Sequence, residues 1–291
     1  MGKKNKLAEL IRCCLTMISP KLNTKILYYR KLHKRLNLDH PETLNEKIQW
    51  LKFNTYWNNP VVKQCADKYR VREYLQEKGF SELLIPLIGA YDDVGEIPWD
   101  TLPERFVLKL NSGCGYNLVV TDKSRLDISR TQKALREWMK SRYWLLTAEL
   151  QYKDVKPYIL IEDFLSSGTG ELPVDYKFFC MNGKSNYVMA CVDRGSETDV
   201  KFYFFDRDWN MMLFTDDAVD DKDRVIPKPD GLDEAFDCAE KLAQGFPFVR
   251  VDLYIVNGKI YFGELTFTPS AGMNRHLLPE ADLKLGEELQ L

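Results

Sequence analysis

The stretch VRVDLYIVNGKIYFGELTF, residues 249–267, predicts a pair of antiparallel strands. Two apolar runs flank Asn257 and Gly258, a dipeptide that strongly predicts a β-hairpin with a two-residue turn. Each run carries one acid, Asp252 before the turn and Glu264 after it. Because side chains alternate between the two faces of a strand, both carboxylates are expected to point the same way from paired strands.

Alternation also places Arg250 and Tyr254 on the face of the first acid, and Phe262 and Thr266 on the face of the second. Two neighbouring carboxylates in an apolar setting repel each other and are hard to ionise. A divalent cation bound to both removes this free-energy cost. Mg²⁺ prefers such hard oxygen ligands and completes its octahedron with water and nucleotide phosphates. Arg250 beside them would stabilise charge on a phosphoryl group in transfer. The alternative is an edge hairpin whose acids face solvent and pair with Arg250 and Lys259.

A second stretch, FVLKLNSGCGYNLVV at residues 106–120, suits phosphate binding. Lys109 ends an apolar strand, and Gly113 and Gly115 follow in a loop where backbone N–H groups can approach an anion. It lacks the GK[ST] sequence of a P-loop, and a plain glycine-containing hairpin is the alternative. Cys114 is not favoured as a nucleophile, because none of the three histidines of the chain is near it in sequence.

The totals describe a globular protein: 291 residues, 45% of them hydrophobic, can bury a sizeable core. Lys and Arg number 41 against 43 Asp and Glu, which gives no reason to expect a nucleic-acid partner. The seven cysteines are scattered without CxxC spacing, as expected of free thiols in a reducing cytosol, and no structural disulfide is predicted.

The first 36 residues are basic, with ten Lys or Arg and a single acid, Glu9. The apolar segment LAELIRCCLTMISP is interrupted by charges and falls short of the roughly 20 residues that a spanning helix needs. Two interpretations remain: a helix that lies on the anionic inner face of a membrane, or a helix packed on its own domain. A cytoplasmic protein, in the first case peripheral at the inner membrane, is expected.

The pattern of apolar residues and turns along the chain predicts an α+β fold in three parts. Residues 1–80 read as helical and basic, 81–165 as short strands with the glycine-rich loop, and 166–291 as hairpins with one long helix. A single helix is expected over residues 59–79, ending at Gly79. Asn182-Gly183 predicts a further hairpin.

Together these pieces resemble the ATP-grasp fold, in which two α+β subdomains enclose ATP. More closely, the chain resembles the TupA-like ATP-grasp family of bacterial polysaccharide biosynthesis from about residue 40 to the C-terminus. The motifs that carry this resemblance, in chain order, are TLNEKIQWLKF, ADKYRVREYL, LPERFVLKLNSGCG, DYKFFCMNGK, FVRVDLY and IYFGELTFTPSAG.

The resemblance implies a role for each matching position. ATP would be bound by Lys68, Lys109, Asn111, Ser112, Gly113 and Gly115 at its phosphates and by Glu162, Asp163, Phe164 and Leu165 at its adenine. Mg²⁺ would be held by Asp252, Glu264 and Thr266, although the family's third ligand is usually Asn and a hydroxyl is a poorer one. Asp175, Lys177 and Arg250 would serve the reaction itself.

The activity implied is a carboxylate–amine ligase that uses ATP and Mg²⁺ to join an amino acid to a hexuronic acid of a capsule, O-antigen or teichuronic-type glycan. Three alternatives stay open: a sugar kinase with the same nucleotide site, a non-catalytic scaffold, and a glycosyltransferase. The last would use the DRD triplet at Asp206–Asp208, although its short flanking strands favour a hairpin turn there.

Overall fold

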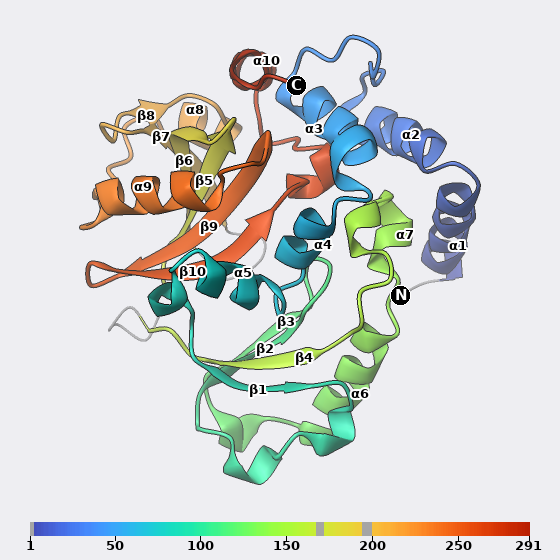
Figure 1. Cartoon of the computed structure of the whole chain (residues 1–291), viewed down its shortest axis with the longest axis vertical. Helices are drawn as coiled ribbons and strands as arrows, with labels where there is room; N and C mark the ends of the chain where they lie inside the picture. Colours follow the sequence, from blue (N-terminus) through green and yellow to red (C-terminus); the bar gives the residue numbers. More distant parts are fainter. Residues whose placement is uncertain (1–2, 167–171, 194–199) are drawn as a thin grey trace.

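The computed structural model describes residues 3–166, 172–193 and 200–291. It is an α+β protein with two antiparallel sheets, one above the other in Figure 1, and a group of N-terminal helices beside them. The predicted fold class is confirmed. The two sheets face each other across the region where the sequence predicts the nucleotide site.

The larger sheet has six strands in the order β10-β9-β5-β6-β7-β8. Its strands are β5 (Asp175–Met181), β6 (Lys184–Val192), β7 (Lys201–Asp206), β8 (Met211–Met212), β9 (Phe248–Val256) and β10 (Lys259–Thr266). Helix α9 (Leu232–Leu242) covers one face, where Phe236 meets Phe178 of β5 edge to face with ring centroids 4.9 Å apart. This apolar packing fixes the platform from which the predicted metal ligands project.

The smaller sheet has four strands in the order β1-β4-β2-β3. They are β1 (Leu87–Tyr91), β2 (Phe106–Leu110), β3 (Asn117–Val120) and β4 (Ile159–Asp163). Alternate residues of β2, among them Phe106 and Leu108, are fully buried in a core completed by α6 (Ile128–Met139). The other face of β2 is thereby left to the site.

The N-terminal part of the chain is helical, and further helices lie later in the chain. They are α1 (Lys3–Ile18), α2 (Pro20–Leu32), α3 (Leu44–Leu51), a π-helix (Lys52–Tyr56), α4 (Pro60–Ala66) and α5 (Val71–Glu77), with α7 (Tyr143–Thr147), α8 (Asp216–Asp220) and α10 (Pro279–Glu288) later in the chain. Thr43 begins α3 with a capping box completed by Glu46. Within the described residues, no helix is long and apolar enough to cross a membrane.

The prediction of one helix over residues 59–79 is wrong, although Gly79 does follow its end with φ +80°. The chain leaves the helix at Asp67, whose backbone is extended. The Asp67 carboxylate then accepts hydrogen bonds from the N–H groups of Tyr69 and Arg70 at 2.8 and 3.3 Å, which stabilises a turn in place of the next helical turn. This break turns Lys68 toward the site.

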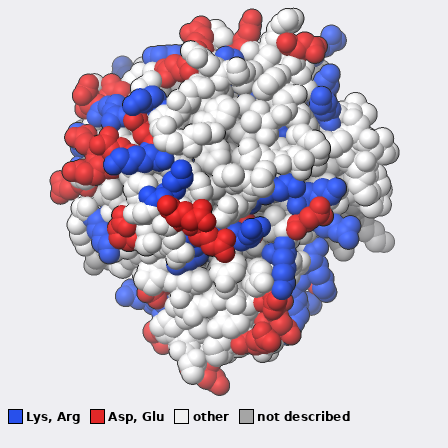
Figure 2. All heavy atoms as spheres, viewed as in Figure 1, with Lys and Arg blue, Asp and Glu red and all other residues white. Residues whose placement is uncertain are grey.

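Both predicted hairpins are confirmed. Asn182-Gly183 joins β5 to β6 and Asn257-Gly258 joins β9 to β10, each with positive φ at both residues as a type I′ turn requires. The DRD triplet forms the turn after β7, where the Asp206 carboxylate accepts hydrogen bonds from Asn210 at 2.8 and 3.0 Å. On the face shown in Figure 2, basic and acidic groups are interspersed.

Candidate active site

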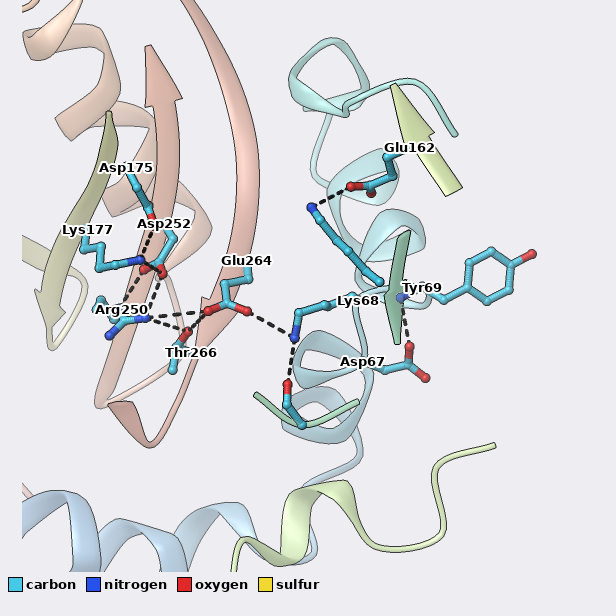
Figure 3. A network of polar contacts seen from close by, with 12 residues as sticks. Asp67, Lys68, Tyr69, Glu162, Asp175, Lys177, Arg250, Asp252, Glu264 and Thr266 are labelled. Atoms are coloured by element: carbon cyan, nitrogen blue, oxygen red, sulfur yellow. Dashed lines mark hydrogen bonds and ion pairs between the residues drawn. The ribbon is translucent and has the colours of Figure 1, made fainter. Parts of the chain in front are cut away.

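The centre of the site is a row of charged side chains across three strands. Lys177 of β5 lies opposite Asp252 of β9, which in turn lies opposite Glu264 of β10. Figure 3 shows the three side chains on one face of the sheet, with Arg250 joined to both acids by dashed lines. The carboxylates therefore lie side by side, as strand alternation predicts.

The same alternation is wrong for Phe262, which was expected on the face of Glu264. The ladder shifts register between these two residues, so Gly263 has no partner and Phe262 pairs with Leu253 in the core. Such a bulge inverts the side-chain direction on one side of it. A Cβ at Gly263 would lie 2.9 Å from the Asp252 carbonyl oxygen, which explains the glycine.

Asp252 is buried and held by two cations. Arg250 donates from Nε and Nη2 to its two oxygens, both at 2.7 Å, and Lys177 Nζ donates to Oδ2 at 2.6 Å. Lys177 also contacts Asp175 at 2.5 Å. Burial alone would lower the pKa of Lys177, but the two aspartates raise it above its usual value, so the ammonium stays charged.

Glu264 is contacted by a lysine from the opposite side of the site. Lys68 Nζ lies 3.2 Å from Oε2 and also donates to the Gly113 carbonyl at 3.0 Å, so that it links the glycine-rich loop to the larger sheet. Thr266 donates to Oε1 at 3.0 Å, and Arg250 lies 3.6 Å from the same oxygen. Burial alone would raise the pKa of Glu264, but Lys68 and Arg250 lower it below its usual range.

The smaller sheet supplies the facing wall. Lys109 of β2 lies diagonally opposite Glu162 of β4, and Nζ donates to Oε2 at 2.6 Å. Arg72 of α5 lies 3.6 Å from the other oxygen of Glu162 and donates to the Ile85 carbonyl at 3.1 Å. Arg72 was missed from sequence, because nothing in its motif indicates which distant acid it meets.

A cavity of about 290 Å³ lies between these two walls. Its lining includes Lys68, Lys109, Gly113, Gly115, Asp175, Lys177, Asp252 and Glu264. An adjoining cavity of about 60 Å³ is lined by the predicted adenine-binding segment, Glu162, Asp163, Phe164 and Leu165, together with Tyr254. The structure thus brings most of the predicted nucleotide and metal residues to one place.

Two predicted phosphate-binding residues lie elsewhere. Asn111 is fully buried, and its side chain bonds Asp67, the Lys156 carbonyl and the Tyr158 N–H at 2.9–3.0 Å. Since the Asn111 carbonyl also accepts from the Lys68 N–H at 2.8 Å, this residue positions Lys68 rather than facing the cavity. Ser112 lines a neighbouring cleft.

The donor set fits a hard divalent cation that is shared with a ligand. Asp252 and Glu264 offer carboxylate oxygens, and Asp175 Oδ1 is buried without a hydrogen-bond partner in the described structure. Among the described residues no group of three or more His, Cys, Asp or Glu side chains is arranged to hold a metal by itself. The Thr266 hydroxyl donates to Glu264 and accepts from Arg250 at 3.3 Å, so its role as a ligand stays a prediction.

The fold and the site together define an ATP-grasp protein. Residues 46–290 match the family described as TupA-like ATP-grasp, and the chain belongs to that family. No protein of curated function matches it in sequence.

Several solved structures are similar to this chain at low identity. D-alanine–D-alanine ligase from Bacillus anthracis, complexed with ATP, is 17% identical with a TM-score of 0.47, covering 78% of this chain and 65% of that one. The corresponding ligase from Helicobacter pylori is 15% identical with a TM-score of 0.45, covering 85% and 69%. N5-carboxyaminoimidazole synthetase from Staphylococcus aureus, complexed with ADP, is 15% identical with a TM-score of 0.41, covering 71% and 45%. The chain thus spans under two thirds of the length of the Bacillus anthracis ligase.

Proposed function

We propose that this chain is an ATP- and Mg²⁺-dependent carboxylate–amine ligase that joins an amino acid to a hexuronic acid of a bacterial surface glycan. The observation that carries the proposal is the single cavity in which Lys68 and Lys109 face Asp252 and Glu264. Cations that would bind a triphosphate and carboxylates that would bind its metal ion thereby line one cavity.

The lysines of this cavity are held ready to exchange partners. Lys109 forms an ion pair with Glu162. Lys68 forms an ion pair with Glu264 and donates a hydrogen bond to the Gly113 carbonyl. Incoming phosphate oxygens would take these charges, while the glycine-rich loop closes over them. The carbonyl and N–H groups of residues 162–165 would receive the adenine ring in the adjoining apolar cavity.

The reaction would run in two steps that use positioning and charge rather than a protein nucleophile. An acceptor carboxylate oxygen attacks the γ-phosphorus, and ADP leaves with the bridging oxygen. The amine nitrogen then attacks the acyl carbon, its proton is lost, and inorganic phosphate leaves with the carbonyl–oxygen bond broken. Mg²⁺, held by Asp252 and Glu264, would neutralise the triphosphate, and Arg250 and Lys177 would stabilise the transferring phosphoryl group.

Product mass tests this proposal. The protein is incubated with ATP, Mg²⁺, a uronic-acid glycan and a panel of amino acids, with Glu264→Gln as the matched control. Release of ADP with a product heavier by one amino acid less water supports the ligase, and Glu264→Gln should lower turnover at least ~10³-fold. A product heavier by one phosphate would show the kinase alternative instead, and absence of ADP with every pair would defeat both.

We also propose that α1 and α2 contact the inner face of the membrane near a lipid-linked glycan. Large apolar side chains of these helices are exposed, including Leu10, Met17, Ile18 and Ile26, with Ile18 80% exposed. The side chains of Lys3, Lys4 and Lys6, part of the basic N-terminus, lie outside the described residues. Sedimentation with vesicles tests the contact: Ile18→Asp should abolish binding to vesicles rich in phosphatidylglycerol, and unchanged binding would disprove it.

A further inference from the structure

Another cavity of about 570 Å³, the basic cavity, lies outside the nucleotide site. Its walls come from α1, α2 and α7 and from the loop after β10. Its basic lining residues are Arg12, Arg30, Lys31, His33 and Arg275, and none of the described residues that line it is acidic. A cavity of this size accommodates a small molecule, and its charge selects an anion.

The cations of this cavity have no acidic partners. In residues 3–166, 172–193 and 200–291, no ion pair involves Arg12, Arg30, Lys31 or Arg275. Arg12 Nε is buried and lacks a hydrogen-bond partner there. Burial and the neighbouring Arg275 lower the pKa of Lys31, as expected of cations held close together. Cations gathered in one cavity without an ion-pair partner create a positive potential that favours binding of an anion.

The cavity is built before any ligand arrives, because buried polar contacts fix its walls. Thr16 of α1 donates to the Leu145 carbonyl of α7 at 2.6 Å and accepts from Asn23 of α2 at 2.7 Å. Lys52 donates to Thr24 of α2 at 3.0 Å and to the Thr147 carbonyl of α7 at 3.2 Å. Three helices are thereby held to one another, so little ordering is needed on binding.

The loop that closes the cavity has an unusual backbone. Ser270 and Ala271 are consecutive residues with positive φ, 53° and 58°, a left-handed conformation that is unfavourable for a residue with a Cβ. Gln49 Nε2 holds the loop by donating to the carbonyls of Ala271 and Gly272, both at 2.8 Å. Strain of this kind is retained mainly at ligand sites, where the surrounding structure imposes it.

The cavity adjoins the nucleotide site through a shared wall. The ring of Tyr143 lines the cavity and packs on the glycine-rich loop, since a Cβ at Gly113 would lie 3.0 Å from its Cγ. On the other side, Ser270 follows Thr266 of β10 by only four residues. Tyr143 therefore lies between this cavity and the glycine-rich loop, which places a molecule held in the cavity close to the nucleotide site.

We propose that this cavity binds the phosphate or diphosphate group of a sugar acceptor, so that the acceptor's carboxylate reaches the nucleotide site. The proposal rests on the proposed ligase function. Three arginines and Lys31 exceed the charge of one carboxylate, which favours a group with at least two negative charges. A lipid-linked and a nucleotide-linked sugar share this diphosphate chemistry.

Calorimetry with free glucuronic acid, glucuronic acid 1-phosphate and UDP-glucuronic acid tests the proposal. The two phosphorylated probes should bind at least ~10-fold more tightly than the free acid. Arg30→Glu combined with Arg275→Glu should remove that difference, while Lys25→Glu, an exposed change on α2 outside the cavity, should keep it. Equal affinity for all three probes, or an unchanged preference in the double variant, would overturn the proposal. A short-chain lipid diphosphate sugar that binds more tightly than UDP-glucuronic acid assigns the lipid-linked source, and the reverse order assigns the nucleotide-linked one.

Pyrophosphate binding without nucleotide separates this inference from the ligase proposal. Binding that is lost in the Arg30/Arg275 double variant but kept in Lys68→Met supports the cavity, whether or not ADP is ever released. Binding that is lost in Lys68→Met and kept in the double variant places the anion at the glycine-rich loop and refutes the cavity. Arg30 and Arg275 are exposed, and circular dichroism checks that the double variant is folded.

Discussion

The nucleotide cavity and the basic cavity differ in whether their cations form ion pairs with carboxylates. In the nucleotide cavity the cations Lys68, Lys109 and Lys177 each contact a carboxylate within 3.2 Å. In the basic cavity no described lining residue is acidic, and Lys31 is influenced by Glu149 only from a distance, without an ion pair in the described structure. A ligand site can thus contain ion pairs whose carboxylates the ligand replaces, or cations that have no ion-pair partner until the ligand binds.

The difference follows from burial. The nucleotide-site lysines are largely enclosed, and an enclosed unpaired charge would cost several kcal/mol. Arg30 and Arg275 are exposed to water, which makes their repulsion tolerable without an acid. The first cavity is therefore stable by itself, whereas the second gains most when an anion enters.

Asp252→Asn should have the largest effect, because it removes the buried acid shared by two cations and leaves Lys177 with Asp175 alone and Arg250 with Glu264 alone. Arg250 and Lys177 lose their shared carboxylate, and we expect about 3–5 kcal/mol less stability in urea unfolding. Added phosphate should restore part of the loss by supplying an anion. A loss under ~1 kcal/mol, or no response to phosphate, would show that pairing does not distinguish the cavities.

Lys52→Met probes the buried cation behind the basic cavity. Burial lowers the pKa of Lys52 to about 7, although Glu149 acts to raise it, so between pH 7 and its ordinary value near 10.5 the unfolded chain binds a proton that the folded chain lacks. The lysine thus makes stability rise with pH across this window, by up to about 1.4 kcal/mol per pH unit. Urea unfolding at pH 7 and pH 9 should show a flatter dependence in Lys52→Met, and equal slopes would contradict the shift.

Lys68→Met tests whether Lys68 exchanges its contact with the Glu264 carboxylate for one with a phosphate. If Lys68 leaves Glu264 for a phosphate, its loss should weaken binding of a non-hydrolysable ATP analogue about 10-fold, as measured by calorimetry with Mg²⁺. Lys63→Met, on the preceding helix and outside the cavity, is the matched control. Affinity that falls equally in both variants would count against a phosphate contact.

Asp206→Ala should have the smallest effect, because its turn lies outside both cavities. Loss of its two hydrogen bonds to Asn210 should cost about 1 kcal/mol, measured by urea unfolding, with unchanged ADP release. A large loss of activity together with loss of UDP-sugar binding would revive the glycosyltransferase alternative.

Sequence reasoning was most successful where local rules determine structure. Strand alternation and the Asn257-Gly258 turn were enough to bring Asp252 and Glu264 together. It failed at Gly263, because a one-residue bulge leaves no periodic signal and is recognised only from the partner strand. It failed likewise at Asp67, whose side-chain hydrogen bonds compete with a helix that the apolar pattern favours.

The basic cavity could not be predicted because its walls are far apart in sequence. Arg12 and Arg30 line the same cavity as Arg275 only because α2 packs on the loop after β10. In this packing, Tyr28 of α2 and Met273 of the loop belong to one buried hydrophobic cluster. From sequence the basic N-terminus was explained as a membrane or self-packing helix. Neither interpretation anticipated that the same segment encloses a cavity with a distant loop.

The position of Lys68 has a kinetic consequence. Its ammonium joins the Gly113 carbonyl to Glu264, and these contacts have to open before Lys68 can bind a phosphate oxygen instead. Nucleotide association then waits on the opening of these contacts and should be slower than free diffusion to the site. A lysine that strengthens the final complex thereby delays its formation.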